Sequence, residues 1–147
     1  MTTILDQFIL TATSETGVTE IKGGLHSSRI LEYHAVTTLK AKEDEVAWCS
    51  SFVNWVVEQC GVIPTKSAAA RSWLNWGKPI PAPVRGCIVV LDRRSADNPN
   101  AAHVGFFASE HAGLIYLLGG NQDNTVKTAP YDKKRVLGYR VPENYVG

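Results

Sequence analysis

Cysteine is scarce in this 147-residue sequence, with Cys49, Cys60 and Cys87 as its three examples. An odd number at wide spacing excludes the disulfide framework of a small secreted scaffold. If residues 46–60 form a helix, Cys49 and Cys60 lie about 16 Å apart along it, which is too far for a disulfide. We therefore expect reduced thiols rather than crosslinks.

An excess of charge and long apolar runs are also missing. The formal net charge is +1, whereas a nucleic-acid or anionic-membrane surface usually shows as a strong basic excess. No apolar run reaches the roughly 20 residues needed to cross a bilayer, and the N-terminus lacks the basic start and cleavage site of a secretory signal. We expect no nucleic-acid partner, no membrane insertion and synthesis in the cytoplasm.

Motifs for metals and nucleotide cofactors are absent as well. The His and Cys residues show none of the paired spacings of zinc sites. The sequence contains neither a phosphate-binding glycine loop nor a dinucleotide fingerprint. No metal and no cofactor are therefore expected.

The first half of the chain has apolar residues at helical spacing. The length predicts a single domain over residues 1–147. Helices are expected from Ile4 to before Gly17, over residues 28–38, from an N-cap at Asp44 to Gly61, and over residues 65–76.

The residue pattern changes at the proline-rich segment "KPIPAPVRG", residues 78–86. We expect this segment to be a crossover between layers. The expected strands after it are "CIVVLD", "AHVGFFAS", "LIYLLGG", "TVKTAPY" and "VLGYRVP". Helices followed by short strands predict an α+β fold, with the helices packed on one side of an antiparallel sheet.

The stretch "DEVAWCSSFVNWVVEQC" carries Cys49 in the first turn of a predicted helix. Unpaired amides and the positive end of the helix dipole lie there, and they favour the nucleophilic thiolate. The alternative is that Cys49 is a small buried hydrophobe on the apolar face of the helix. Cys60 and Cys87 fit that second interpretation better.

A nucleophilic cysteine needs a base, and histidine is the usual one. His111 lies in a predicted hairpin turn, and His26 and His34 precede the cysteine in the N-terminal half. His103 differs, because it opens a strand whose apolar residues would anchor it. We expect His103 to be the base.

The expected hairpin provides a partner for this histidine. If the turn centres on Ala112, His103 faces Asn121 and Gly105 faces Gly119, with paired Cβ atoms roughly 5 Å apart. An amide there can accept the Nδ1 proton and leave Nε2 free to act on a thiol. A slip of one residue would present Gln122 instead. The two glycines leave room for an extended ligand, or they are plain turn residues.

A cysteine on a helix, a histidine opening a strand and an amide on the next strand follow the order of papain-like thiol hydrolases. The segments "DEVAWCSSFVNWV", "SAAARSWLNWG", "RGCIVVL", "HVGFF", "LLGGNQ" and "RVLGYR" resemble the bacterial and phage cell-wall hydrolases of the NlpC/P60 and CHAP superfamily. The resemblance covers about Gly17 to Arg140. It is strongest to a compact branch found in phage lysis modules and interbacterial toxin loci.

The resemblance implies a papain-like α+β fold that cleaves amide bonds in peptidoglycan without a metal. It places the nucleophile at Cys49, the base at His103 and the third polar residue at Asn121 or Gln122. Cys87 is a departure, because many relatives carry an acidic or polar residue after the glycine.

The substrate groove is expected to involve aromatic side chains. Trp48, Trp73, Trp76 and Tyr33 could line it, together with the space left by Gly105 and Gly119. Tryptophans at helical spacing are also ordinary core residues, which is the competing interpretation.

The resemblance also implies partners and a place of action. We expect peptidoglycan as substrate, a cognate immunity or inhibitor protein, and delivery to the periplasm or cell wall by a holin or a secretion apparatus. The competing functions are a non-catalytic wall-binding module on the same scaffold and a thiol hydrolase toxin acting on proteins.

Overall fold

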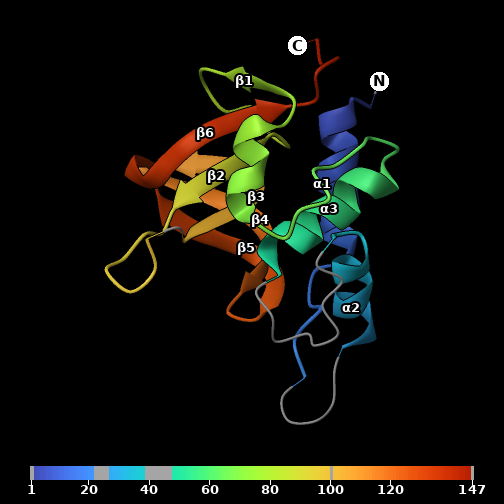
Figure 1. The fold of residues 1–147 in the computed structure, drawn as a ribbon. Helices are drawn as coiled ribbons and strands as arrows, with labels where there is room; N and C mark the ends of the chain where they lie inside the picture. The colour runs from blue at the N-terminus through green and yellow to red at the C-terminus, as the bar shows by residue number, and fades with distance from the viewer. Residues whose placement is uncertain (1, 22–26, 39–47, 100, 147) are drawn as a thin grey trace.

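The computed structural model describes residues 2–21, 27–38, 48–99 and 101–146. The helices come first in the chain and gather beside the sheet (Figure 1). They are α1 (Ile4–Ser14), α2 (Ser28–Ala35), α3 (Cys49–Gln59) and the 3-10 helix η1 (Ala70–Asn75).

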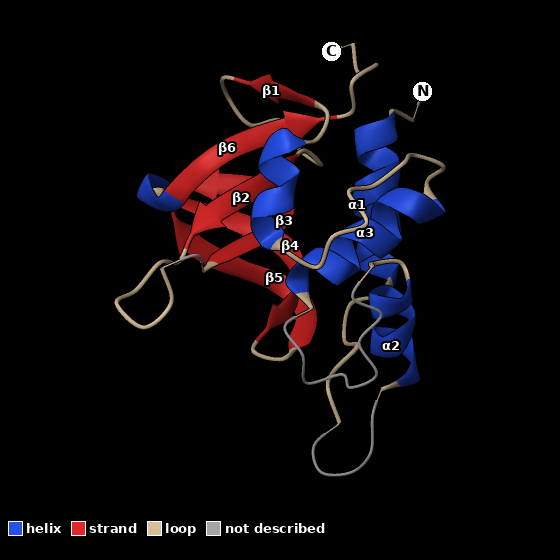
Figure 2. Ribbon diagram, in the orientation of Figure 1, coloured by secondary structure: helices blue, strands red, loops and turns tan. Residues whose placement is uncertain are grey.

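The second half forms one antiparallel sheet in the order β1-β6-β2-β3-β4-β5 (Figure 2). Its strands are β1 (Lys78–Ile80), β2 (Ile88–Asp92), β3 (Ala102–His111), β4 (Leu114–Gln122), β5 (Thr125–Asp132) and β6 (Val136–Val141), with the short 3-10 helix η2 (Lys133–Arg135) before β6. Helices packed against an antiparallel sheet confirm the predicted α+β fold.

Helices α1 and α3 bury their apolar faces on the central strands. A capping box between Thr3 and Asp6 starts α1, and the ring of Phe8 lies 5.7 Å from that of Phe106 on β3. Phe52 of α3 meets the same Phe106 ring edge-on at 6.4 Å. The core between helices and sheet therefore lies directly behind the strand that carries His103.

Helix α3 begins later than predicted. Its N-cap is Trp48, which makes no side-chain capping hydrogen bond, and Cys49 is the first helical residue. The expected N-cap, Asp44, lies outside the described residues. Cys49 is thus closer to the helix end, and to its free amides, than the sequence indicated.

The predicted helix over residues 65–76 is wrong in its first half. Only Ala70–Asn75 are helical, as η1. The side chain of Asn54 accepts from the Lys66 amide at 2.6 Å and donates to the Ser67 carbonyl at 3.1 Å, and Lys66 has φ +61°. These hydrogen bonds to the backbone compete with those of a helix.

The proline-rich segment is also different from the prediction of a simple crossover. It contains β1, which pairs with β6 through Lys78–Val141, Pro79–Arg140 and Ile80–Tyr139. β1 ends the sheet, and an edge strand tolerates a proline because one of its sides needs no ladder hydrogen bond.

The β3–β4 hairpin departs from the predicted register by one residue next to the turn and follows it beyond a bulge. Ala112 and Gly113 both have positive φ, +53° and +81°, as a two-residue type I′ turn requires. The turn pairs His111 with Leu114, and a bulge between Phe107 and Ser109 shifts the ladder by one residue. Phe107 then faces Leu117 as predicted.

No helix in the described ranges combines the length and the apolar character that a bilayer crossing needs.

Candidate active site

The sulfur of Cys49 lies against the strand that carries His103. Helix α3 packs on β3 and β4, and the backbone amide of Val104 lies close enough to the Cys49 thiol to oppose the rise of its pKa. Val104 directly follows His103 in the chain. The fold therefore brings the helix start and the histidine strand together at this point.

The thiol of Cys49 is buried, with 8% of the residue exposed. Burial raises its pKa above the ordinary value, while hydrogen bonds from the Val104 and Ser50 amides and the charge of Arg93 oppose that rise. Desolvation therefore opposes the thiolate that the helix start was expected to favour, and it is the larger influence on this pKa. The resting side chain is a thiol.

The imidazole of His103 is held on one side by two partners. Its Nε2 lies 2.9 Å from Gln122 Oε1 and 3.2 Å from the Tyr131 hydroxyl. Burial lowers the pKa of His103 to about 4, with the Gln122 hydrogen bond acting in the opposite direction. The ring is therefore neutral at pH 7.

The amide of Gln122 fixes the tautomer of this neutral ring. Its Nε2 donates to the carbonyl of Leu117 at 3.1 Å and to that of Lys127 at 2.5 Å. The oxygen Oε1 must then face His103, and since it only accepts, His103 Nε2 carries the proton. Nδ1 is left as the basic nitrogen. This is the reverse of the predicted assignment, in which Nδ1 carries the proton and Nε2 is free.

The backbone of β4 decides between the two predicted amides. The β4–β5 register breaks between Gly119 and Gln122, and Asn121 has φ +56°. This irregularity places Gln122 on His103 with 3% of it exposed. Asn121 is half-buried and makes no hydrogen bond to His103 among the described contacts.

Gly105 and Gly119 were expected to leave room for a ligand, but side chains of the protein occupy the space beside them. A Cβ at Gly119 would lie 2.8 Å from Gln122 Oε1, and one at Gly105 would lie 3.3 Å from the Leu117 Cβ. Gly119 therefore makes space for the amide that holds His103. The predicted ligand-binding role of Gly105 and Gly119 is not supported, because side chains fill that space.

Gly120 was not singled out from the sequence, although it lies at the same point. A Cβ there would meet the Trp48 ring at 2.6 Å and the Phe52 Cβ at 2.7 Å. Only glycine lets the first turn of α3 approach β4 this closely. The "GG" pair was the available signal, but its long-range contacts could not be read from the sequence.

Three of the four aromatic residues expected in a groove are core residues. Trp48, Tyr33 and Trp73 have 0% exposure. Their polar atoms donate internally, at 2.6 Å to Glu20, 2.7 Å to Glu15 and 3.0 Å to the Ser50 hydroxyl, respectively. Their role is to position the start of α3, because Trp48 and Ser50 flank Cys49.

Trp76 is half-buried but lies at the other end of α3. It lines a cavity of about 570 Å³ with Gly61, Ile63 and Tyr145, and its Nε1 donates to the Ile63 carbonyl at 2.8 Å. Gly61 follows the C-terminus of α3, so the axial rise of an 11-residue helix separates this cavity from Cys49 by roughly 16 Å. Trp76 does not belong to the candidate site.

A smaller cavity of about 340 Å³ adjoins the partners of the imidazole. Its lining includes Gln122 and Tyr131, the two partners of His103 Nε2, together with the exposed Arg93. Burial raises the pKa of Tyr131 to about 12, so its hydroxyl stays protonated. Tyr131 and Arg93 were missed in the sequence, where each is a single residue outside any motif.

The remaining thiols and histidines have other surroundings. Cys87 is fully buried, and burial raises its pKa to about 11. His34 is buried with Nδ1 2.8 Å from the Ser51 hydroxyl, and His111 is exposed at the hairpin turn. His26 lies outside the described residues. Within the described ranges no three His, Cys, Asp or Glu side chains gather as metal ligands.

A comparison with family models identifies the family of the chain. The sequence model of the CHAP domain matches residues 41–121, a range that includes Cys49, His103 and Asn121 and ends one residue before Gln122. No curated protein matches the chain. CHAP domains are generally amidases or peptidases that act on peptidoglycan. The match covers more than half of the sequence and agrees with the observed α+β layout, so the chain belongs to the CHAP domain family.

Proposed function

We propose that the protein is a cysteine amidase or endopeptidase that cleaves an amide bond in the peptide part of peptidoglycan. One observation supports this most strongly. A fixed amide holds His103 in the tautomer whose free nitrogen is Nδ1, and the next residue of that strand, Val104, acts on the pKa of the Cys49 thiol through its backbone amide. The family membership supports the substrate class.

The proposed reaction starts from a neutral pair. Because the pKa of Cys49 is raised and that of His103 is lowered, the proton moves only as the thiol attacks. The S–H proton passes to His103 Nδ1 while the sulfur bonds to the substrate carbonyl carbon. The oxyanion lies at the first amides of α3, which receive no side-chain cap.

The second half of the cycle reverses the proton transfer. His103 Nδ1–H protonates the leaving nitrogen as the C–N bond breaks, which leaves a thioester on Cys49. Water then gives a proton to Nδ1 and its hydroxide to the acyl carbon. The C–S bond breaks, the sulfur leaves with the bonding electrons, and it takes the proton back from Nδ1, which restores the neutral pair. Throughout, Gln122 and Tyr131 accept hydrogen bonds from Nε2–H and stabilise the transient imidazolium.

The direct test compares two cysteine variants of the same helix. Cys49→Ala is expected to lose roughly 10³-fold or more of its wall-lysing activity, with an unchanged unfolding midpoint. Cys60→Ala removes a half-buried thiol at the far end of α3 and should keep that activity. Turbidity loss of purified cell walls measures both, and equal lysis by Cys49→Ala and wild type would refute the proposal.

A non-catalytic wall-binding module is the second candidate, and the buried, un-ionised Cys49 is the observation that favours it. Wild-type protein would then sediment with insoluble walls and release no fragments from them. A thiol hydrolase toxin acting on proteins would release none either, and would not sediment with walls. Mass analysis of defined muropeptides after incubation separates the hydrolase from both.

The proposed substrate implies action in the periplasm or cell wall. Delivery by a holin or a secretion apparatus, and restraint by a cognate immunity protein, stay predictions.

A further inference from the structure

Arg93 lies on the same face of the sheet as His103. Its backbone amide donates to the Ala101 carbonyl at 3.0 Å, which continues the β2–β3 ladder by one pair beyond Asp92–Ala102. In that ladder Leu91 pairs with His103. Paired residues share a face, and so do residues two apart on a strand. The Arg93 side chain therefore starts diagonally beside the imidazole.

A cavity links Arg93 to the two side chains that hold the imidazole. Arg93 lines the same 340 Å³ space as Gln122 and Tyr131. Both of those side chains contact His103 Nε2, at 2.9 Å and 3.2 Å. A ligand group bound by Arg93 in this cavity would therefore lie one residue away from the imidazole, beside its two partners.

The charge of Arg93 is not compensated by its neighbours. In the same cavity Lys127 and Asp123 form an ion pair with each other. The next arginine along the chain, Arg94, binds the Asp92 carboxylate at 2.7 Å. Within the described ranges no carboxylate forms an ion pair with Arg93.

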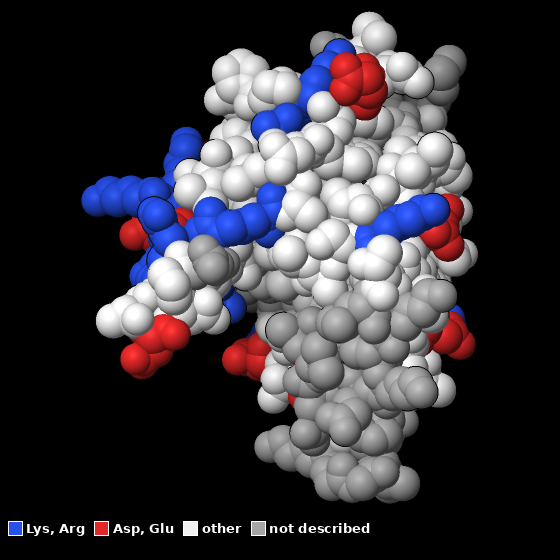
Figure 3. Space-filling view, in the orientation of Figure 1, with Lys and Arg blue, Asp and Glu red and all other residues white. Residues whose placement is uncertain are grey.

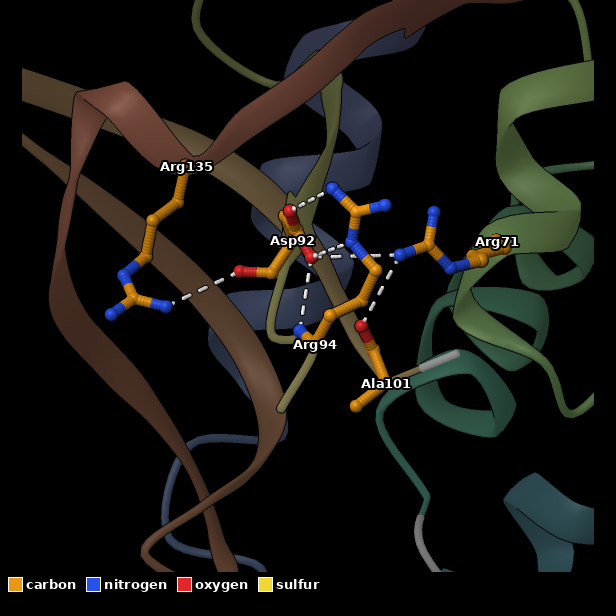
Figure 4. Close-up of polar contacts among 5 residues, drawn as sticks. All are labelled: Arg71, Asp92, Arg94, Ala101 and Arg135. Atoms are coloured by element: carbon orange, nitrogen blue, oxygen red, sulfur yellow. Dashed lines mark hydrogen bonds and ion pairs between the residues drawn. The ribbon is translucent and has the colours of Figure 1, made fainter. Parts of the chain in front are cut away.

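Asp92, the residue before Arg93 in the chain, is engaged by other arginines (Figure 4). Its carboxylate is engaged by Arg94 and lies 3.6 Å from a guanidinium nitrogen of Arg71, while Arg135 reaches its backbone carbonyl. Asp92 and Arg94 alternate with Arg93 along the strand direction and so start from the other face. Basic side chains also predominate on the sheet side of the view in Figure 3.

The field of Arg93 reaches the reacting groups. Burial is the largest influence on the pKa of Cys49, His103 and Tyr131. The positive charge of Arg93 opposes the rise that burial causes at Cys49 and Tyr131, and it adds to the decrease at His103. Arg93 is thus an exposed cation beside the site, and no carboxylate in the described part of the chain pairs with it.

We propose that Arg93 is a specificity residue that binds a carboxylate of the substrate peptide beside the bond that is cut. A guanidinium forms two parallel hydrogen bonds with a carboxylate, which fixes orientation as well as charge. Peptide stems of the wall carry carboxyl groups that are either free carboxylates or amidated. The identity of the peptide rests on the proposed function, whereas the anion preference of the site does not.

The first experiment measures this preference without a wall substrate. Iodoacetate and iodoacetamide alkylate the same thiolate, but only iodoacetate is anionic. Their rate ratio at Cys49, read by peptide mass analysis, cancels any change in thiolate content. In Arg93→Gln the iodoacetate-to-iodoacetamide ratio is expected to fall roughly three- to tenfold at low salt. The exposed Arg85, on the loop before β2, supplies the control Arg85→Gln, whose ratio should equal that of wild type.

The second experiment uses paired muropeptides whose carboxylates are free or amidated. Wild type should show the higher kcat/KM on the free acid, and Arg93→Gln should lose that preference while still cleaving the amide form. Two results would overturn the role of Arg93 and leave the hydrolase intact. One is the same free-acid-to-amide ratio of kcat/KM in wild type and Arg93→Gln, and the other is an unchanged alkylation ratio. A changed alkylation ratio without hydrolysis of either peptide supports the anion site and overturns the hydrolase.

Discussion

At the scale of single residues, Gln122 controls which nitrogen of His103 is basic. Its two N–H groups are both used by backbone carbonyls, so the side chain cannot rotate to present a donor without losing these bonds. Tyr131 adds a second oxygen on the same ring nitrogen. The proton-accepting side of the ring is thereby directed away from Gln122.

This arrangement predicts different results for the two neighbouring amides. Gln122→Ala is expected to lower kcat/KM by roughly 10²-fold, because the ring loses its tautomer and orientation. Asn121→Gly removes the other amide, and glycine tolerates the φ of +56° found there. Its kcat/KM should stay within about threefold of wild type.

Steady-state kinetics on a soluble muropeptide measures both variants, and circular dichroism checks that each is folded. A larger loss of kcat/KM in Asn121→Gly than in Gln122→Ala would show that Asn121, and not Gln122, orients His103.

At the scale of elements, the close approach of α3 to β4 sets the position of the Cys49 sulfur. Gly120 is the point of contact, since a Cβ there would overlap both Trp48 and Phe52. Trp48 is further tied by its hydrogen bond to Glu20. A small displacement of this helix end would move the sulfur relative to His103.

Gly120→Ala is therefore expected to cost about 1–3 kcal/mol of unfolding free energy and to lower activity in the molecules that remain folded. Gly138→Ala is the matched control, a strand glycine whose added Cβ would meet only the end of the Leu74 side chain, at 3.2 Å. Urea unfolding and wall lysis measure the pair. Equal effects of the two substitutions would contradict the importance of the α3–β4 contact.

The elements that local signals specify were predictable from the sequence. β2 to β6 follow from short apolar or alternating runs bounded by turn residues, and α1 to α3 from helical spacing. The helix expected over residues 65–69 failed because Asn54, distant in sequence, binds that backbone. β1 was missed because its proline is tolerated only at a sheet edge, and edge position is a property of the whole sheet.

The candidate site divides in the same way. Residue type and order pointed to Cys49 and His103, and the hairpin register limited the amide to Asn121 or Gln122. The choice between them depends on an irregularity in the β4–β5 register that no local sequence pattern predicts. The purposes of Gly119, Gly120 and Trp48 depend on contacts between distant segments, so the sequence showed the residues without their roles.

At the scale of the whole molecule, the buried neutral His103 links stability to pH. The pKa of His103 is about 4 in the folded protein and near 6.5 when the chain is unfolded. The unfolded state therefore binds the proton more readily, and stability is lost as the pH falls from about 6.5 toward 4.

His103 alone should make the protein about 2 kcal/mol less stable at pH 5 than at pH 7. The measurement is urea unfolding at both pH values for wild type and His103→Gln. The wild type should lose about 2 kcal/mol more than the variant. Identical losses would show that His103 is not buried as a neutral ring.

The coupling between the Cys49 thiol and the His103 imidazole can be measured as the alkylation rate of Cys49 in wild type and in His103→Asn. If Nδ1 of His103 takes the thiol proton, the variant should react with iodoacetamide at least about tenfold more slowly at pH 8. Cys60, half-buried at the far end of α3, is the internal reference and should react equally in both proteins. Equal rates at Cys49 would contradict the account, because sulfur and imidazole would then be neighbours without being coupled.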